Sequence, residues 1–256
     1  MPDEPLSMPD ESLSMPDEPL SVPVDPLSDE KIIDSWLKNA APWTAAVRDD
    51  QIESRRLVTN AAIIDAVLSQ SPHTALDIGC GEGWLVRALA AHGIQSIGVD
   101  VVSDLIARAA NAGGGDFRVA SYEDIAAGSL DVEVDAAIAN FSLIGHEAVD
   151  NLVAYVPRLL RPNGVLIIQT LHPAMTIGDH PYADGWREGS WAGFSEDFTD
   201  PAPWFFRTIE SWIRLLRKSG FDLLELREPV HPTTGLPASM IFVATTTGYS
   251  AVTKVS

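Results

Sequence analysis

Residues 75–93 read ALDIGCGEGWLVRALAAHG, a strand-like apolar run that ends in glycines and passes directly into a helix-like run. Gly79, Gly81 and Gly83 fall within five positions of one another. A plain strand-to-helix turn needs one glycine, and every further glycine costs backbone order. The extra glycines indicate that something approaches this backbone closely, because glycine has no Cβ to collide with it.

Strand-like and helix-like runs alternate on both sides of this stretch. The pattern predicts strands near 74–79, 95–100, 116–120, 133–140 and 164–171, with helices near 83–92, 103–112, 146–160 and 207–219. Such alternation is typical of parallel strands joined by helical crossovers in a three-layer α/β sandwich. FDLLELREPV and ASMIFVATTT are joined by HPTTGLP, which is too short for a crossover helix. The domain is therefore expected to end in an antiparallel hairpin.

Composition sets the expected domain organisation. Residues 1–28 repeat a proline-rich acidic heptapeptide without any basic residue, which predicts a disordered tail. The 256 residues, 46% of them apolar, suffice for one well-packed α/β domain. We expect capping helices at 29–72 and a main domain at 73–250, with an aromatic lid insertion at about 173–206.

Charge and cysteine content argue against several partners. A net charge of −19 disfavours nucleic acid, since phosphate binding depends on Lys and Arg. The sequence shows no signal-peptide pattern and no run of about 18 apolar residues, so we expect no membrane contact and a cytoplasmic location. The one cysteine, Cys80, cannot form an intramolecular disulfide, and no metal cluster is expected. Its place within the glycine run predicts a small buried spacer.

Two cofactor classes fit a glycine loop between a strand and a helix. A dinucleotide fingerprint, G-x-G-x-x-G, would need glycine where Trp84 stands. Asp77, just before the loop, would repel a diphosphate but suits a cationic cofactor such as a sulfonium. A dinucleotide-dependent oxidoreductase stays an alternative that the glycine spacing disfavours.

LDIGCGEG resembles the first motif of the class I S-adenosylmethionine-dependent methyltransferases. The resemblance continues in order through IGVDVV, FRVASYEDI, VDAAIANFSLIG, LLRPNGVLIIQTLHP and the closing hairpin, over about residues 50–247. It implies a Rossmann-like sandwich with a seven-stranded, mostly parallel sheet. It also implies that S-adenosylmethionine is bound and leaves as S-adenosylhomocysteine after methyl transfer.

The resemblance further implies contacts with this cofactor. Gly79 and Gly81, with Cys80 between them, would lie beneath its methionine and ribose parts, and Asp77 would lie near its amino group. Asp100 would accept hydrogen bonds from both ribose hydroxyls, and Val101 would flank the adenine.

Other expected cofactor contacts follow the same resemblance. Arg55 is a candidate partner for the cofactor carboxylate, and a solvated helix face is the alternative. Ser121, followed by Tyr122, stands where family members often have an acid that meets the adenine amino group. Asn140 and Phe141 would close over the reacting end, although a purely structural role for Phe141 is an equal alternative.

The acceptor and the base are the least constrained parts of the site. The aromatic residues of the 173–206 insertion predict a lid that encloses a small planar molecule, or else a small core of the lid itself. His172, at the end of the fifth strand, is the first candidate for a general base, followed by His146 and Glu147. A protein side chain as acceptor, and a non-catalytic module that binds S-adenosylmethionine, stay open as alternatives.

Overall fold

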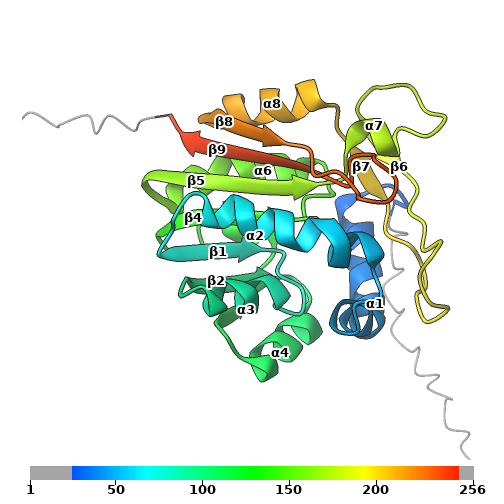
Figure 1. Ribbon diagram of the computed structural model, residues 1–256, viewed down its shortest axis with the longest axis horizontal. Helices are drawn as coiled ribbons and strands as arrows, with labels where there is room; N and C mark the ends of the chain where they lie inside the picture. The colour runs from blue at the N-terminus through cyan, green and yellow to red at the C-terminus, as the bar shows by residue number, and fades with distance from the viewer. Residues whose placement is uncertain (1–24, 248–256) are drawn as a thin grey trace, which may run out of the picture.

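Seven strands form the central layer of the computed structural model, which describes residues 25–247 (Figure 1). They are β1 (Thr74–Ile78), β2 (Gln95–Asp100), β3 (Asp116–Val119), β4 (Val134–Asn140), β5 (Leu160–Thr170), β8 (Phe221–Arg227) and β9 (Met240–Thr246). Their order across the sheet is β3-β2-β1-β4-β5-β9-β8. β9 runs opposite to the other six strands and pairs antiparallel with β5 and β8. The predicted Rossmann-like fold with a C-terminal antiparallel hairpin is confirmed.

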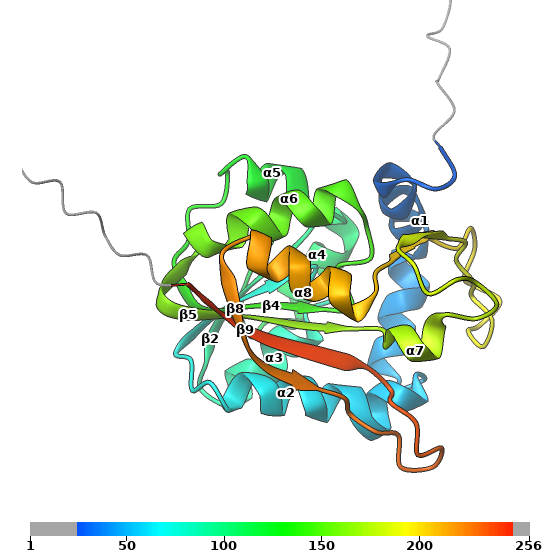
Figure 2. The same cartoon turned by 90° about the horizontal axis from the view of Figure 1, so that it is seen from above.

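Helices cover both faces of this sheet, as Figure 2 shows from above. One face is covered by α2 (Asn60–Leu68) and α3 (Trp84–Ala91), with α4 (Ser103–Ala112) beside α3. The other face is covered by α5 (Tyr122–Ala126), α6 (Glu147–Tyr155) and α8 (Ile209–Lys218). Each helix buries an apolar stripe against strands that are apolar on both sides, which is the usual arrangement of parallel sheets. The strand order reverses between β1 and β4, and open α/β sheets bind ligands at such a point.

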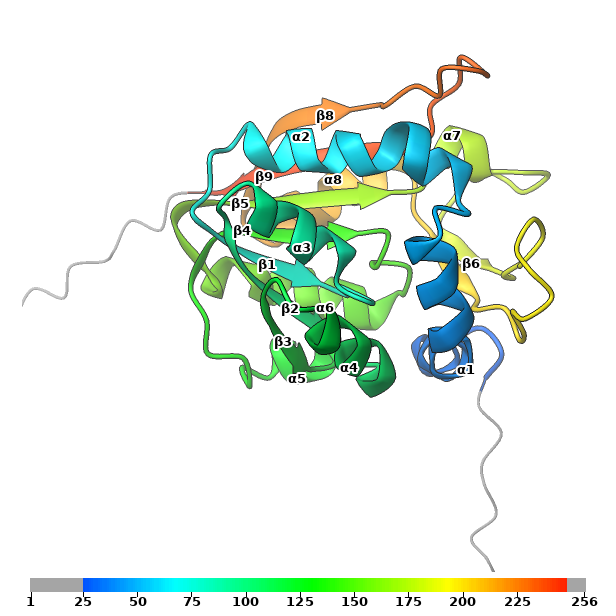
Figure 3. The same cartoon turned by 60° about the horizontal axis from the view of Figure 1, so that its bottom comes forward.

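The longest helix lies outside these layers. α1 (Asp29–Arg48) crosses the carboxyl ends of the parallel strands (Figures 1 and 3). A π-helical turn, η1 (Arg55–Thr59), then leads directly into α2. Of the predicted capping segment 29–72, α1 lies over the sheet edge. α2 instead packs against the sheet through Ile63, Ala66 and Val67.

The insertion after β5 folds into short elements. It contains α7 (Pro173–Thr176) and a two-stranded antiparallel sheet of β6 (Gly185–Arg187) and β7 (Trp204–Phe206). The Phe205 N–H donates to the Ile144 carbonyl at 2.7 Å, which fastens this sheet to the loop after β4. The segment between β6 and β7 returns along α1 and lies beside it.

Two boundaries differ from the predicted ones by more than two residues, and one short helix was not predicted. The helix expected over 146–160 ends at Tyr155 and continues as a 3-10 turn, η2 (Val156–Arg158), because Pro157 lacks the N–H that an α-helix needs. β5 begins at Leu160 rather than at 164, since Leu160 already pairs with Val134. The five-residue α5 was not expected.

Most of the predicted tail 1–28 lies outside the described residues, as do residues 248–250 of the predicted main domain. Within residues 25–247, no helix is long and apolar enough to cross a bilayer. The same part of the chain holds no group of three or more His, Cys, Asp or Glu side chains arranged to bind a metal ion.

Candidate active site

The glycine loop runs from the end of β1 to the start of α3 with three left-handed residues. Gly79, Gly81 and Gly83 have φ angles of 73°, 56° and 83°, which other residues rarely adopt. A Cβ on Gly79 would lie 2.4 Å from Ser142 Cβ, and one on Gly83 would lie 2.7 Å from the Phe117 ring. A Cβ on Gly81 would meet nothing closer than 3.5 Å. Packing inside the protein therefore requires Gly79 and Gly83, and of the three only Gly81 would direct a Cβ into open space.

That open space is a cavity of about 420 Å³ at the carboxyl ends of the strands. Its walls come from α1, η1, the glycine loop, the ends of β2, β4 and β5, and the segment between β6 and β7. The fold brings nine of the predicted cofactor residues to this cavity: Arg55, Gly79, Gly81, Asp100, Val101, Ser121, Tyr122, Asn140 and Phe141. Asp77 and Cys80 lie behind the lining.

Asp100 is held rigidly at the end of β2. Its Oδ2 accepts a hydrogen bond from the Gly81 N–H and its Oδ1 accepts one from the Val102 N–H, each at 2.9 Å. Burial raises the pKa of Asp100, and the backbone N–H groups oppose this by stabilising the carboxylate. Each oxygen keeps a further lone pair, so the carboxylate can still accept two hydroxyl donors.

A buried carboxylate and a guanidinium lie near the glycine loop. Asp77 is 2% exposed, and its Oδ1 has no hydrogen-bond partner among residues 25–247. Burial and the neighbouring Asp100 raise its pKa to about 7, while the positive charge of Arg55 opposes the rise. Burial also lowers the pKa of Arg55 to about 10, against the attraction of Glu82, Asp77 and Asp50. An oppositely charged ligand group beside each of these side chains would offset the free-energy cost of burying its charge.

The two residues after β3 already use their polar atoms in the protein. Ser121 is the N-cap of α5: its Oγ accepts from the Asp124 N–H at 3.0 Å, and its own N–H donates to Asp124 Oδ2 at 3.1 Å. The Tyr122 hydroxyl donates to the Ser142 carbonyl at 3.0 Å. Burial raises the pKa of Tyr122, which keeps this hydroxyl protonated. Of the Ser121 and Tyr122 side chains, only Ser121 has a hydroxyl proton that is still available as a hydrogen-bond donor to a ligand.

The end of β4 carries a free amide and a strained backbone. Asn140 Oδ1 is buried without a hydrogen-bond partner among the described residues. Phe141 follows with a φ angle of 56°, a left-handed conformation that is strained for an aromatic residue. Its N–H donates to the Gln169 carbonyl at 2.8 Å, which holds the turn in place.

Cys80 is a buried spacer in this structure. It is 4% exposed and packs with Val86, Ile106 and Phe117 between α3 and α4. Burial raises the pKa of its thiol, with smaller contributions from Asp77 and Asp100, so the thiol stays protonated. Cys80 therefore lies behind the glycine loop and does not line the cavity.

The three base candidates lie outside the cavity lining. His172 is 5% exposed, and it caps α7 by accepting from the Ala174 N–H at 3.2 Å through Nδ1. Its Nε2 lies 2.7 Å from Glu228 Oε1. The His146 ring stacks on Phe205 with centroids 4.0 Å apart. Glu147 is exposed at the start of α6.

Asp29 and the tryptophans of α1 line the cavity and were not predicted, whereas Trp191 and Phe194 belong to the predicted aromatic insertion. Asp29 lines the cavity, but its two oxygens cap α6 by accepting from the N–H groups of His146 at 2.7 Å and Ala148 at 3.0 Å. An aromatic wall consists of Trp36 and Trp43 from α1 and Trp191 and Phe194 from the insertion. The seven-residue spacing of the α1 tryptophans, two helical turns, is a signal that could have located half of this wall.

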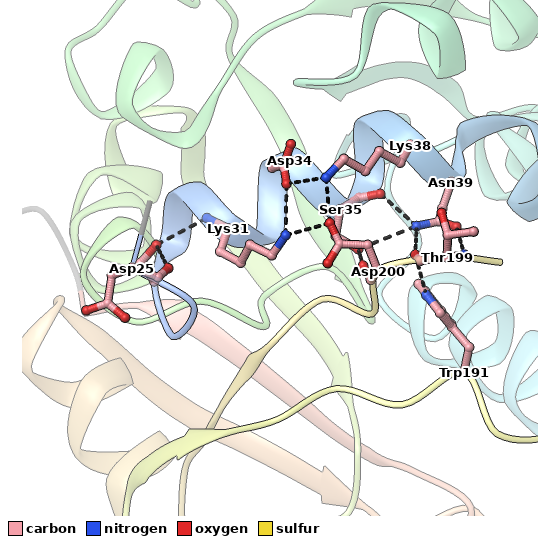
Figure 4. A network of polar contacts seen from close by, with 10 residues as sticks. Asp25, Lys31, Asp34, Ser35, Lys38, Asn39, Trp191, Thr199 and Asp200 are labelled. Atoms are coloured by element: carbon pink, nitrogen blue, oxygen red, sulfur yellow. Dashed lines mark hydrogen bonds and ion pairs between the residues drawn. The ribbon is translucent and has the colours of Figure 1, made fainter. Parts of the chain in front are cut away.

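Polar contacts fasten the insertion to α1, as Figure 4 shows. Asp200 Oδ2 lies 2.6 Å from Lys31 Nζ and 2.5 Å from Lys38 Nζ. The Ser35 hydroxyl donates to the Asp200 carbonyl at 2.6 Å. The Trp191 indole N–H donates to the Thr199 carbonyl at 2.9 Å. These contacts hold the aromatic residues of the insertion against the tryptophans of α1.

Comparison with known proteins finds methyltransferases among the similar sequences. Residues 76–168 match a family described as a methyltransferase domain. A ubiquinone biosynthesis O-methyltransferase from Xanthomonas oryzae is 31% identical over 118 residues, which are 43% of this chain and 47% of that protein. One from Mesorhizobium japonicum is 32% identical over 103 residues, 38% of this chain and 40% of the relative. The chain thus matches about half or less of the length of these curated relatives.

Solved structures share the fold. A magnesium protoporphyrin IX methyltransferase from Synechocystis with bound S-adenosylhomocysteine has a TM-score of 0.60 at 15% identity, covering 85% of this chain and all (100%) of the other. A 1,6-didemethyltoxoflavin-N1-methyltransferase from Burkholderia thailandensis has a TM-score of 0.57 at 19% identity, covering 90% and 93%.

The sheet order, the cavity at its switch point and the matched motif region define an α/β protein of the methyltransferase type. Residues 76–168 are thus similar to methyltransferase domains, in agreement with the resemblance of the sequence motifs to class I S-adenosylmethionine-dependent methyltransferases.

Proposed function

We propose that this chain transfers the methyl group of S-adenosylmethionine to an oxygen or nitrogen atom of a small, uncharged, planar molecule. The observation that carries the proposal is the pairing of Asp100 with Gly81 inside the cavity: a fixed carboxylate with free lone pairs lies beside a backbone that leaves room for a ligand. A ribose with two hydroxyl donors fits such a carboxylate. The adenine would then lie toward Val101 and Ser121.

The cofactor's amino-acid end would occupy the side of the cavity near η1. Arg55 supplies a positive charge for a carboxylate, and Asp77 supplies a negative charge for an ammonium group. Solved neighbours with bound S-adenosylhomocysteine support this choice of cofactor. The sulfonium methyl would point toward Asn140 and Phe141, which are expected to lie at the reacting end.

The acceptor would occupy the apolar half of the cavity. Its lining there consists of Ile32, Ile33, Trp36, Ile144, Leu171, Trp191 and Phe194. Among residues 25–247, Arg55 is the one cationic side chain of the lining, and the cofactor carboxylate would use it. An anionic acceptor would therefore be desolvated without a counter-charge, which is costly. The aromatic wall favours a flat molecule. The names of the relatives include both an O- and an N-methyltransferase, which supports either atom.

The proposed reaction is an in-line displacement. A lone pair of the acceptor forms a bond to the methyl carbon, the carbon–sulfur bond breaks, and its electron pair stays on sulfur in S-adenosylhomocysteine. Since His172, His146 and Glu147 lie outside the cavity lining, we propose that no side chain acts as a base and that the acceptor arrives with a free lone pair. The proton it carries leaves to water afterwards. Positioning and exclusion of water would then supply the acceleration.

Ligand-induced stabilisation tests the cofactor half of this proposal. S-adenosylhomocysteine at about 100 times its Kd should raise the unfolding midpoint by about 5–10 °C, because such binding stabilises by about 2.7 kcal/mol. NADH serves as the control and should leave the midpoint unchanged. A shift with NADH alone would overturn the proposal and restore the dinucleotide alternative.

Release of S-adenosylhomocysteine tests the acceptor half. The protein is incubated with S-adenosylmethionine and a set of neutral heterocycles and phenols, matched with benzoates of the same size. Turnover of neutral compounds supports the proposal, whereas turnover of benzoates alone contradicts an uncharged acceptor.

A further inference from the structure

The helical turn η1, which leads into α2 beside the cavity, is π-helical rather than α-helical. At η1 the Asn60 N–H donates to the Arg55 carbonyl, five residues earlier, instead of the carbonyl four residues earlier. Single π turns inside helices are rare and are frequently found at functional sites. This turn carries Arg55 and Thr59 one turn apart, and both line the cavity.

The Arg55 guanidinium is fixed in place while one of its nitrogens stays unused. Its Cζ lies 4.8 Å from the Trp84 ring centroid and 5.6 Å from that of Trp43, so it is packed between two indoles. Its Nε donates to Asn60 Oδ1 at 3.3 Å. Its Nη2 is buried without a partner among the described residues. A buried, oriented donor of positive charge with no counter-charge in contact suits a bound anion.

Thr59 supplies a second unused donor on the same turn. It is 2% exposed, and its Oγ1 has no hydrogen-bond partner within residues 25–247. Buried helical threonines commonly donate to the carbonyl one turn earlier, as Thr44 does to Ala40 at 2.7 Å. Thr59 makes no such bond. Because an unsatisfied buried hydroxyl is destabilising, its natural partner is a ligand in the cavity.

We propose that Thr59 Oγ1 is a second donor to the α-carboxylate of the cofactor, beside Arg55 Nη2 on the same π turn. Asn60 is a positioning residue that holds the guanidinium through Nε. The inference rests on the proposed function and adds Thr59 and Asn60 to it. Asp77, whose Oδ1 is also buried and unpaired within the described chain, lies behind the lining and supplies a negative charge for the ammonium group.

This site makes binding depend on the amino-acid end of the ligand. S-adenosylhomocysteine has that end, whereas 5′-methylthioadenosine has the same adenosine and sulfur without it. Removal of a donor from η1 therefore weakens the first ligand selectively. A substitution that merely disturbs the fold weakens both ligands alike.

The test is calorimetric binding of both ligands to the full chain. Thr59→Val, which keeps the shape and removes the hydroxyl, should weaken S-adenosylhomocysteine binding by about 10- to 100-fold, because a hydrogen bond to a charged group is lost. Binding of 5′-methylthioadenosine should change by less than about twofold. Thr59→Ser should restore binding to within about threefold. The ligand-free Thr59→Val protein should unfold at the same or a higher temperature, since an unsatisfied buried polar atom has been removed.

Thr44→Val is the matched control, because Thr44 is also a buried helical threonine but is bonded within its own helix and does not line the cavity. It should bind both ligands as the wild type does. For Asn60, a double-mutant cycle with Arg55 separates positioning from general stability. Asn60→Ala should weaken S-adenosylhomocysteine binding about 5- to 10-fold in the wild type and cause no further loss in Arg55→Met.

The outcomes separate the two proposals. If the wild type binds neither ligand, the proposed function is wrong and the carboxylate site falls with it. If the wild type binds S-adenosylhomocysteine, the carboxylate site alone is overturned by any one of three results. These are wild-type affinity in Thr59→Val, equal weakening of both ligands, and full additivity of Asn60→Ala with Arg55→Met.

Discussion

Asn39 on α1 and Thr199 in the insertion exchange two hydrogen bonds. Asn39 Nδ2 donates to the Thr199 carbonyl at 2.7 Å, and the Thr199 N–H donates to Asn39 Oδ1 at 2.9 Å. The Asn39 side-chain amide thus pairs with the Thr199 backbone as a neighbouring β-strand would, although the two residues lie 160 positions apart in the sequence. Asn39 is fully buried (0% exposed), whereas Thr199 is exposed, so the pair joins the buried face of α1 to the surface of the insertion.

Asn39→Ala should detach this part of the insertion. The Thr199 N–H loses its partner and the Thr199 carbonyl keeps only the Trp191 indole N–H, so we expect the free energy of unfolding to fall by about 1–2 kcal/mol. Limited proteolysis should then cleave between β6 and β7, while the wild type resists. Lys38→Ala, which removes an exposed contact to Asp200, is the control and should leave the pattern unchanged. Equal protease resistance of Asn39→Ala and the wild type would refute the role of this pair.

Asp100→Asn should weaken cofactor binding. The amide nitrogen would face either the Gly81 or the Val102 N–H, two donors pointing at each other, and one acceptor for the ribose would be lost. We expect a loss of about 10- to 100-fold in affinity for S-adenosylhomocysteine, measured by titration calorimetry. Asp116→Asn, at the exposed start of β3, should bind normally. Unchanged affinity in Asp100→Asn contradicts the ribose assignment.

Cofactor affinity should rise with pH through the titration of Asp77. Burial holds the pKa of this carboxyl at about 7 in the folded protein, above its ordinary 3.8. The folded state therefore binds the proton more tightly than the unfolded chain, and the contribution of Asp77 to stability falls as pH rises from 3.8 to about 7. A ligand ammonium group favours the carboxylate, so affinity for S-adenosylhomocysteine increases over the same window.

Calorimetry at about pH 5.5 and about pH 7.5 measures this dependence. Burial also raises the pKa of Asp100, so the Asp77→Asn variant is needed to separate the two groups. The variant should bind more weakly and with a flatter pH profile. An unchanged slope would assign the dependence to Asp100 instead.

His172→Gln should leave turnover within about threefold of the wild type, since its ring caps α7 and contacts Glu228 outside the cavity lining. The unfolding midpoint should fall, because a buried partner of Glu228 and of the Ala174 N–H is altered. The measurement is the initial rate of S-adenosylhomocysteine release at saturating cofactor. A hundredfold lower rate with unchanged cofactor affinity would restore His172 as a general base.

Local patterns in the sequence were enough to locate most of the sheet. β1, β2 and β4 are short apolar runs bounded by turn residues, and each lies within about one residue of its predicted bounds. The same reasoning located the glycine loop and Asp100, because both follow directly from a strand end. Such features depend on neighbours in the chain, which is why they can be read without a structure.

The features that were missed depend on distant parts of the chain. Asn39 meets Thr199 only after α1 crosses the sheet edge, and no local pattern encodes that contact. Thr59 looks like an ordinary helical residue, and only the π turn shows its hydroxyl to be unpaired. His172 before Pro173 is compatible with a base or with a helix cap, and the hydrogen bond to Ala174 favours the cap.

The different surroundings of the three loop glycines bear on how related sequences should be compared. Gly79 and Gly83 are required by Ser142 and Phe117, so a descendant that had abandoned its reaction would still need both in order to fold. Gly81 has no such neighbour: a side chain there would strain the left-handed backbone and obstruct a ligand, but it would collide with no other part of the protein. An inactive descendant should therefore be recognised by a residue that tolerates a left-handed φ angle, such as asparagine, at this position while both other glycines are kept.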